Sequence, residues 1–160
     1  MTKTDALTAD AANEREIVMT RVLPAPRTAV FDALLSPDQL RRWLTPRGLS
    51  LAVCEVDPMP GGRFRYVWRV PGMPDFGMAG VYHEVERPSR VVHSERCESM
   101  PDGADVQVTT ALAERDDGTL LTLTLRYPDR ATRDAMLASD MTKGVAECYD
   151  ALAALLSAPR

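Results

Sequence analysis

From Leu49 to Tyr127 the chain repeats one pattern, in which a short run of alternating apolar and polar residues is followed by turn residues. This spacing is typical of an antiparallel sheet made of consecutive hairpins. The expected strands are Leu51–Asp57, Arg63–Val70, Met78–Val85, Arg90–Cys97, Val106–Glu114 and Thr119–Tyr127. In Arg63–Val70 three aromatic residues alternate with three arginines, so one face of the sheet is wet and the other is covered.

The cover has to come from the only long helical pattern in the chain, which follows Pro128 and continues to about Ser157. Its apolar residues recur at intervals of three and four, as on one face of a helix. They are Met141, Val145, Cys148, Leu152 and Leu155. We expect an interruption at Ser139 and Asp140 or at Gly144, because these residues weaken a helix interior.

The segment before the sheet contains one β-rich run and two short helical patterns. Glu16–Leu23 predicts a first strand, which the prolines after it terminate. One short helix is expected from Pro26 and a second from the sequence Ser36-Pro-Asp-Gln39, which resembles a capping box. Residues 1–13 hold no continuous apolar run and are expected to be a disordered lead-in, which leaves residues 14–160 as one domain.

Composition narrows the possible partners and the compartment. The chain has 160 residues and a net charge of -4 with mixed signs, which gives no basic surface for nucleic acid or anionic lipid. No apolar run is long enough to span a membrane. Cys54, Cys97 and Cys148 are widely spaced without a CxxC, so neither a disulfide framework nor a zinc site is indicated. We expect a cytoplasmic protein that needs no metal or cofactor.

Several short motifs carry a family resemblance along roughly Glu16–Leu156. They are Arg21-Val-Leu-Pro-Ala-Pro26 running into Val30-Phe-Asp-Ala33, then Pro37, Trp43, Pro46 and Gly48, Asp57 before Gly61-Gly-Arg-Phe64, Gly80-Val-Tyr-His-Glu-Val85 with Pro88, and Gly118-Thr119. With these motifs the chain resembles the activator-of-heat-shock-protein-ATPase-like branch of the START-like (SRPBCC) superfamily. Members commonly place a tryptophan after the position of Gly144, where this chain has Val145, so a wider pocket is expected there.

The resemblance implies an α+β helix-grip fold, in which a curved antiparallel β-sheet wraps around a long C-terminal helix and two short helices follow the first strand. Relatives use the cavity between sheet and helix for lipids, polyketides, hormones or a chaperone partner. The fold alone does not select among these ligands. The residues expected to line such a cavity are Trp43, Phe64, Tyr66, Trp68, Phe76, Met78, Tyr82, His93, Leu121, Leu123, Met141, Val145 and Tyr149.

The two histidines, His83 and His93, have carboxylates beside them in Glu84 and Glu95. Imidazole titrates near neutrality and a carboxylate can orient it, so an acid–base role is one interpretation. Their spacing matches no metal-binding motif, and solvated or singly hydrogen-bonded histidines are the simpler expectation. His93 is the first residue to test for catalysis.

Three hypotheses follow for the function. The first is a binding protein for a small hydrophobic molecule such as a lipid, a polyketide or an aromatic compound. The second is an enzyme of the polyketide cyclase or dehydratase kind, in which one acid or base suffices. The third is a domain that binds a chaperone, a regulator or a second copy of itself through an exposed apolar patch around Trp43 and Leu44.

Overall fold

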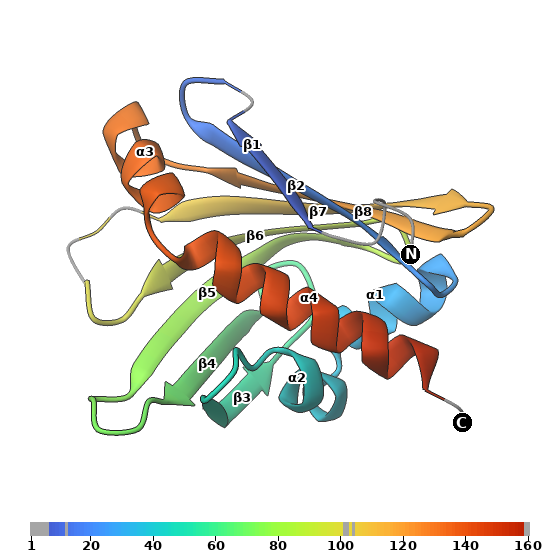
Figure 1. Ribbon diagram of the computed structural model, residues 1–160, viewed down its shortest axis with the longest axis horizontal. Helices are drawn as coiled ribbons and strands as arrows, with labels where there is room; N and C mark the ends of the chain where they lie inside the picture. Colours follow the sequence, from blue (N-terminus) through green and yellow to red (C-terminus); the bar gives the residue numbers. More distant parts are fainter. Residues whose placement is uncertain (1–6, 12, 101–102, 104, 159–160) are drawn as a thin grey trace.

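The computed structural model describes residues 7–11, 13–100, 103 and 105–158, which form one eight-stranded antiparallel sheet and four helices (Figure 1). The strands are β1 (Thr8–Ala11), β2 (Glu16–Leu23), β3 (Ser50–Val56), β4 (Arg63–Arg69), β5 (Phe76–Glu86), β6 (Arg90–Cys97), β7 (Val106–Arg115) and β8 (Gly118–Arg126). The helices are α1 (Arg27–Leu35), α2 (Pro37–Trp43), α3 (Arg130–Ala138) and α4 (Met141–Ser157).

The sheet has the strand order β1-β2-β8-β7-β6-β5-β4-β3. Strands β3 to β8 are joined as consecutive hairpins, which confirms the six strands expected from the alternating pattern. The sheet curves, and α4 lies across its concave face (Figure 1). The α+β helix-grip fold expected from the resemblance is therefore confirmed.

Helices α1 and α2 carry the chain from β2, near one edge of the sheet, to β3 at the opposite edge. The indole Nε1 of Trp43 in α2 donates a hydrogen bond of 2.9 Å to the carbonyl oxygen of Ala33 in α1, which joins the two helices. The expected capping box does not form. Ser36 is at once the C-cap of α1 and the N-cap of α2, and its hydroxyl accepts no capping hydrogen bond.

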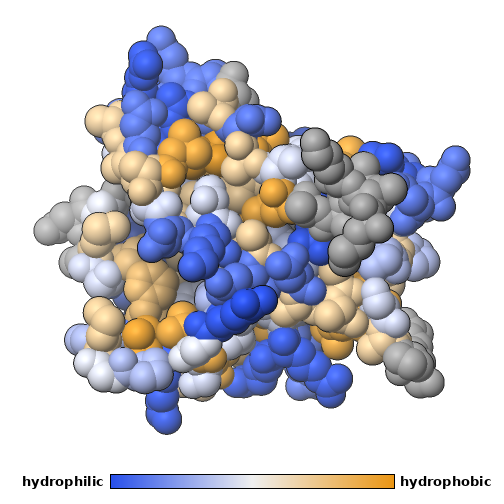
Figure 2. Space-filling view, viewed as in Figure 1, coloured by the Kyte–Doolittle hydropathy of each residue, from blue (hydrophilic) through white to orange (hydrophobic). Residues whose placement is uncertain are grey.

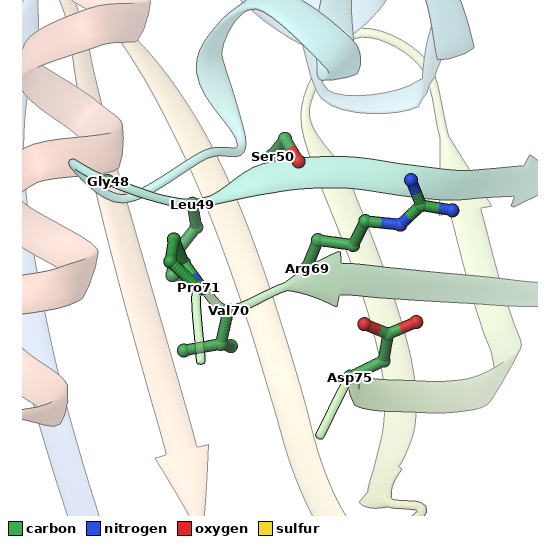
Figure 3. A pocket seen from close by; sticks show the side chains of 7 residues that line it. All are labelled: Gly48, Leu49, Ser50, Arg69, Val70, Pro71 and Asp75. Carbon is green, nitrogen blue, oxygen red and sulfur yellow. The ribbon is translucent and has the colours of Figure 1, made fainter. Parts of the chain in front are cut away.

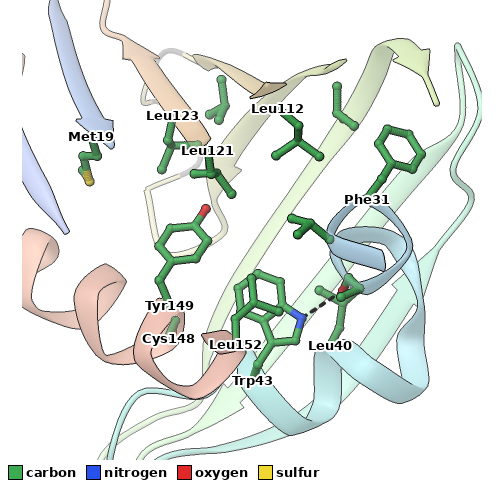
Figure 4. Packing of buried hydrophobic residues seen from close by; sticks show 14 of the residues in the cluster. Met19, Phe31, Leu40, Trp43, Leu112, Leu121, Leu123, Cys148, Tyr149 and Leu152 are labelled. Atoms are coloured by element: carbon green, nitrogen blue, oxygen red, sulfur yellow. Dashed lines mark hydrogen bonds between the residues drawn. The ribbon is translucent and has the colours of Figure 1, made fainter. Parts of the chain in front are cut away.

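The C-terminal pattern forms two helices, and the break falls at Ser139 and Asp140, one of the two positions expected. Asp129 caps α3 by accepting a hydrogen bond of 2.7 Å from the backbone N–H of Thr132. In α4 the buried residues are Cys148, Tyr149 and Leu152, and they face the sheet (Figure 4). Leu121 and Leu123 of β8 lie opposite them, so the seam of α4 closes the core.

The N-terminal segment differs from the expectation of a disordered lead-in. Thr8–Ala11 forms β1, which pairs with β2 in antiparallel register from Thr8 opposite Thr20 to Ala11 opposite Ile17. All four residues of β1 are exposed, so this strand is held by backbone hydrogen bonds and not by apolar burial. Such pairing leaves no hydrophobic pattern for sequence reasoning to detect. Residues 1–6 and 12 lie outside the described part of the chain.

The first test concerns the seam of α4. Leu152 is fully buried at 0% exposure, so Leu152→Asp places an unpaired charge in the core and is expected to unfold the domain. Ala154→Asp is the matched control, because Ala154 is exposed on the same helix. Circular dichroism during thermal denaturation should show no cooperative transition for the first variant and a near-normal one for the second. A native-like melt for Leu152→Asp would reject this packing.

Candidate functional site

One row of residues across three strands places a carboxylate on the concave face of the sheet. Phe64 of β4 lies opposite Gly80 of β5, and Gly80 lies opposite Glu95 of β6. A methyl group at Gly80 would collide with the ring of Phe64 and with the backbone carbonyl oxygen of Ser94. The bare glycine therefore lets the Phe64 ring lie over the sheet, on the side of Glu95.

The next row adds His93 of β6, which lies opposite Tyr82 of β5. The ring of His93 meets the ring of Phe64 edge-on at a centroid distance of 5.1 Å, and its centroid is 6.1 Å from that of Tyr82. The rings continue along the face in pairs that are 5.0–5.9 Å apart. These pairs are Phe64 with Tyr66, Phe64 with Tyr82, Tyr66 with Trp68, and Trp68 with Phe76. We call these seven residues, Phe64, Tyr66, Trp68, Phe76, Tyr82, His93 and Glu95, the concave aromatic cluster.

His93 and Glu95 form a hydrogen-bonded pair inside this cluster. The distance from Nε2 of His93 to Oε2 of Glu95 is 3.1 Å, and the two side chains are 17% and 21% exposed. The other ring nitrogen of His93, Nδ1, is buried and has no hydrogen-bond partner within the described residues. With Nε2 donating to the carboxylate, Nδ1 is an unused acceptor when the imidazole is neutral. The pair thus offers both a base and a carboxylate to a bound molecule.

The four tyrosines of the chain all belong to this interior. Burial raises the pKa of Tyr66, and the nearby Tyr82 and the charge of Glu95 raise this pKa further. Burial also raises the pKa of Tyr82 and of Tyr127 to about 12 and raises the pKa of Tyr149 well above its usual value. The charge of Glu95 adds to the raised pKa of Tyr127 and of Tyr149. Glu95 thus contributes to the pKa shifts of tyrosines from β4, from α4 and from the residue after β8.

The other residues expected to line a cavity lie beneath α4. Trp43 stacks on Tyr149 with ring centroids 5.7 Å apart. The hydroxyl of Tyr149 is directed toward Leu121 and Leu123 of β8 (Figure 4). Met141 and Val145, in the first turns of α4, are partly buried and pack against the same core. This part of the concave face is filled by the protein's own side chains.

The concave aromatic cluster is less completely covered than the region under α4. Phe76 is 37% exposed, and Tyr66 and Met78 are partly buried. Met73, in the turn between β4 and β5, is 67% exposed. Figure 2 shows apolar side chains at the surface beside the start of α4, over β4 and β5. The concave face is thus accessible at the end where these strands meet their turn.

The apolar patch expected around Trp43 and Leu44 is not at the surface. Trp43 is only 4% exposed and Leu44 is partly buried, because α2 turns both residues toward α4 and β4. The backbone oxygen of Leu44 accepts a hydrogen bond of 2.8 Å from Nε1 of Trp68. The sequence pattern suggested that Trp43 lies at the surface, whereas in the structure its side chain is buried in the core.

Two polar members of the site were not among the residues selected from the sequence. Glu95 was weighed only as a neighbour of His93, and Tyr127 was not considered. Strand parity contains the signal for both, since residues two apart on a strand share a face. Glu95 follows His93 by two positions, and Tyr127 continues the buried series Leu121, Leu123 and Leu125 of β8.

The remaining titratable groups behave as structural residues. Burial raises the pKa of Cys54 and raises that of Cys148 to about 12, which keeps both thiols protonated and unreactive. His83 and Glu84 are exposed, away from the concave face.

Among the described residues no group of three or more histidine, cysteine or acidic side chains is arranged to hold a metal ion. None of the described helices is both long enough and apolar enough to cross a membrane.

A separate groove of about 360 Å3 lies at the outer end of β3 and β4 (Figure 3). Its walls come from Leu49, Val70 and Pro71, and Arg69 and Asp75 contribute one charge of each sign. The groove is open to solvent along its length. Its few apolar side chains offer less contact to a small molecule than the aromatic rings of the concave face.

Comparison with known proteins gives consistent results. The sequence model of one family, described as activator of Hsp90 ATPase homolog 1-like protein, matches residues 24–157. A protein of Rhodobacter sphaeroides is 31% identical with a TM-score of 0.91, covering 97% of this chain and 100% of its own. A protein of Chromobacterium violaceum is 28% identical with a TM-score of 0.78, covering 90% and 99%.

The structure of CalU16 from Micromonospora echinospora shares the fold at 24% identity, with a TM-score of 0.62 over 95% of this chain and 84% of its own. No curated protein matches the chain.

The second test follows from the buried tyrosines. Their raised pKa values mean that the folded protein resists tyrosine ionisation, so absorbance at the tyrosinate band should stay flat through pH 10 and rise only near pH 12. The unfolded chain ionises from about pH 10. Stability present below pH 10 is therefore lost as the pH rises toward 12, by roughly 2–3 kcal/mol for each such group. Any tyrosine titrating normally in the native state would contradict this arrangement.

Proposed function

Given that the chain belongs to the family of activator of Hsp90 ATPase homolog 1-like proteins, we propose that it binds a small hydrophobic molecule between the concave face of its sheet and helix α4. The observation that carries this proposal is the concave aromatic cluster. Ligand sites are mostly apolar and aromatic, with a few polar groups that fix the orientation of the ligand. The cluster has this composition, with five aromatic rings around His93 and Glu95.

The way α4 covers the sheet supports a site at the β4 end. Helix α4 packs on α1, α2, α3 and β2. The aromatic residues of β4 and β5 contact mainly one another, and Phe76 remains 37% exposed. Aromatic side chains bury large areas and contribute strongly when a partner covers them. A ligand entering beside the start of α4 gains this burial without displacing the packed residues around Trp43 and Tyr149.

One hydrogen bond and two ring contacts hold the side chain of Trp68 in place, so that it forms a rigid wall of the site. Its Nε1 donates to the backbone oxygen of Leu44, and its ring lies between the rings of Tyr66 and Phe76. A side chain held on three sides loses little freedom when a ligand binds, so more of the contact energy appears as affinity. The same ring provides an optical signal, because indole fluorescence responds to a molecule that lies against it.

A cyclase-like or dehydratase-like reaction is the second candidate, and the His93 and Glu95 pair favours it. The carboxylate orients the imidazole, and its buried Nδ1 has no hydrogen-bond partner within the described residues. A base in this position can remove a proton from a folded, reactive chain. Mass spectrometry of a polyketide-like compound incubated with the protein should then show conversion by the native protein and an unchanged compound with His93→Gln.

We also infer a reducing, cytoplasmic location for the protein. Its three cysteines are free, and Cys54 and Cys148 are buried as small apolar side chains. Secreted domains of this size commonly pair their cysteines, whereas intracellular ones keep them reduced. Fractionation of the source cells with an antibody against the protein tests the inference, and recovery from the medium or envelope would overturn it.

The third test is a thermal-shift screen of fatty acids, sterols, flavonoids and polyketide-like aromatics. A ligand present at about 100 times its dissociation constant stabilises a protein by roughly 2.7 kcal/mol. For a domain of this length that corresponds to a rise in melting temperature of roughly 5–10 °C. We expect hits of this size, accompanied by a change in tryptophan fluorescence. Native mass spectrometry of protein purified from its own host should retain the same class of molecule.

Variants separate binding in the cluster from general stabilisation. Tyr66→Ala should weaken a hit by more than it lowers the stability of the free protein. The control is Arg65→Ala, which alters the neighbouring residue on the outer face, where Arg65 forms an ion pair with Glu98. If no compound shifts melting or fluorescence, the binding proposal fails and a protein partner for the exposed Met73 and Phe76 end becomes the better explanation.

A further inference from the structure

Glu95 is a carboxylate on a face that is otherwise lined by apolar and aromatic groups. It shares this face with Val91 and His93 of β6, and across Gly80 it lies in register with Phe64. Its side chain is 21% exposed. A carboxylate removed from water to this degree loses hydration free energy, which only hydrogen bonds or an opposite charge can restore.

The protein itself supplies little compensation for this charge. Within the described residues the carboxylate of Glu95 has one side-chain hydrogen bond, with Nε2 of His93. A carboxylate can accept about four hydrogen bonds, so most of its capacity is unused.

Arginines on or near the sheet form ion pairs with acidic residues other than Glu95. In the described part of the chain no lysine or arginine forms an ion pair with Glu95. Arg65 lies on the outer face and is paired with Glu98, while Arg21, near α4, is paired with Asp150. Within the described residues the carboxylate of Glu95 therefore has no arginine or lysine partner on the concave face.

The groups around this charge are suited to a cation. The faces of aromatic rings carry negative electrostatic potential and attract ammonium groups within about 6 Å of the ring centre. Phe64 touches the ring of His93, and Tyr66 and Tyr82 follow at centroid distances of 5.0 and 5.3 Å from Phe64. Burial is the main reason that the pKa of Tyr66, of Tyr127 and of Tyr149 is raised, and the nearby Glu95 contributes to each shift.

We propose that the molecule bound in the concave aromatic cluster carries a positively charged amine or quaternary ammonium group on an apolar body, and that Glu95 pairs with this group. The proposal rests on the binding function proposed above and specifies the chemical class of the ligand. The apolar body lies against Trp68 and Phe76 at the open end, and the cationic group pairs with the partly exposed carboxylate of Glu95. A carboxylate ligand such as a fatty acid meets repulsion at the same point.

A series of ligands with one apolar body and different head groups tests the charge preference. Octylammonium, octyltrimethylammonium, octanol and octanoate are titrated into the native protein at neutral pH by isothermal calorimetry. The two cations are expected to bind about tenfold or more tighter than octanol, and octanoate more weakly than octanol. Octanoate binding as tightly as octylammonium would overturn the proposal.

Variants assign the preference to one carboxylate. Glu95→Gln should abolish the advantage of the cations over octanol. Glu95→Asp, which keeps the charge, should retain the cation preference. Glu84→Gln is the matched control, since Glu84 is a carboxylate on the neighbouring strand that pairs with Arg90 at the surface. An undiminished cation preference in Glu95→Gln would also overturn the proposal.

These outcomes are distinct from failure of the binding function itself. If the native protein binds octanol and octanoate as well as the cations, the concave site exists and only the ligand class is wrong. If no member of the series binds and the thermal-shift screen is also empty, the binding function fails and this proposal fails with it. The preference measured on the native protein does not depend on the folding of any variant.

Discussion

One face of an eight-stranded sheet must be removed from water, and the 17-residue helix α4 covers the middle of this face. Leu152 is completely buried at the centre of the contact, with Leu121 of β8 facing it across the core. Helices α1 and α2 extend the cover at the end where the chain crosses between the sheet edges. The other features of the molecule follow from where this cover is complete and where it stops.

Where the cover stops, the sheet keeps large aromatic side chains and not the polar ones that an exposed face would carry. Rings from β4 and β5 then shield one another, and Phe76 at the end of the series is partly exposed. Shielding by neighbours also explains how the polar pair of His93 and Glu95 is retained in the interior. A face that is core at one end and partly open at the other has to tolerate such compromises in packing.

Much of the fold could be predicted from the sequence because its signals are periodic. The alternation in Arg63–Val70 located the covered face, and Ser139 and Asp140 marked the break before α4. β1 could not be predicted, since its residues are exposed and are held by backbone pairing and by a hydrogen bond between the hydroxyls of Thr8 and Thr20. Parity predicted which aromatic residues share the concave face, whereas Glu95 was undervalued because a lone carboxylate in a strand usually faces solvent. Its position opposite Gly80 emerges only from the register of three strands.

The pairing of β2 with β8 has a consequence for the way the chain acquires its structure. Glu16 lies opposite Arg126, and Leu23 lies opposite Thr119. During synthesis β2 therefore cannot pair with β8 until the strands between them have been made. During that interval Ile17, Met19 and Leu23, which are fully buried in the finished protein, lack their neighbours on β8, and only the short β1 can pair with this strand. Contacts between residues so distant in sequence form slowly, and the intermediates that precede them expose apolar surface and are prone to aggregate. Synthesis speed and chaperone access over this interval thus bear on the yield of active protein as directly as the stability of the final fold.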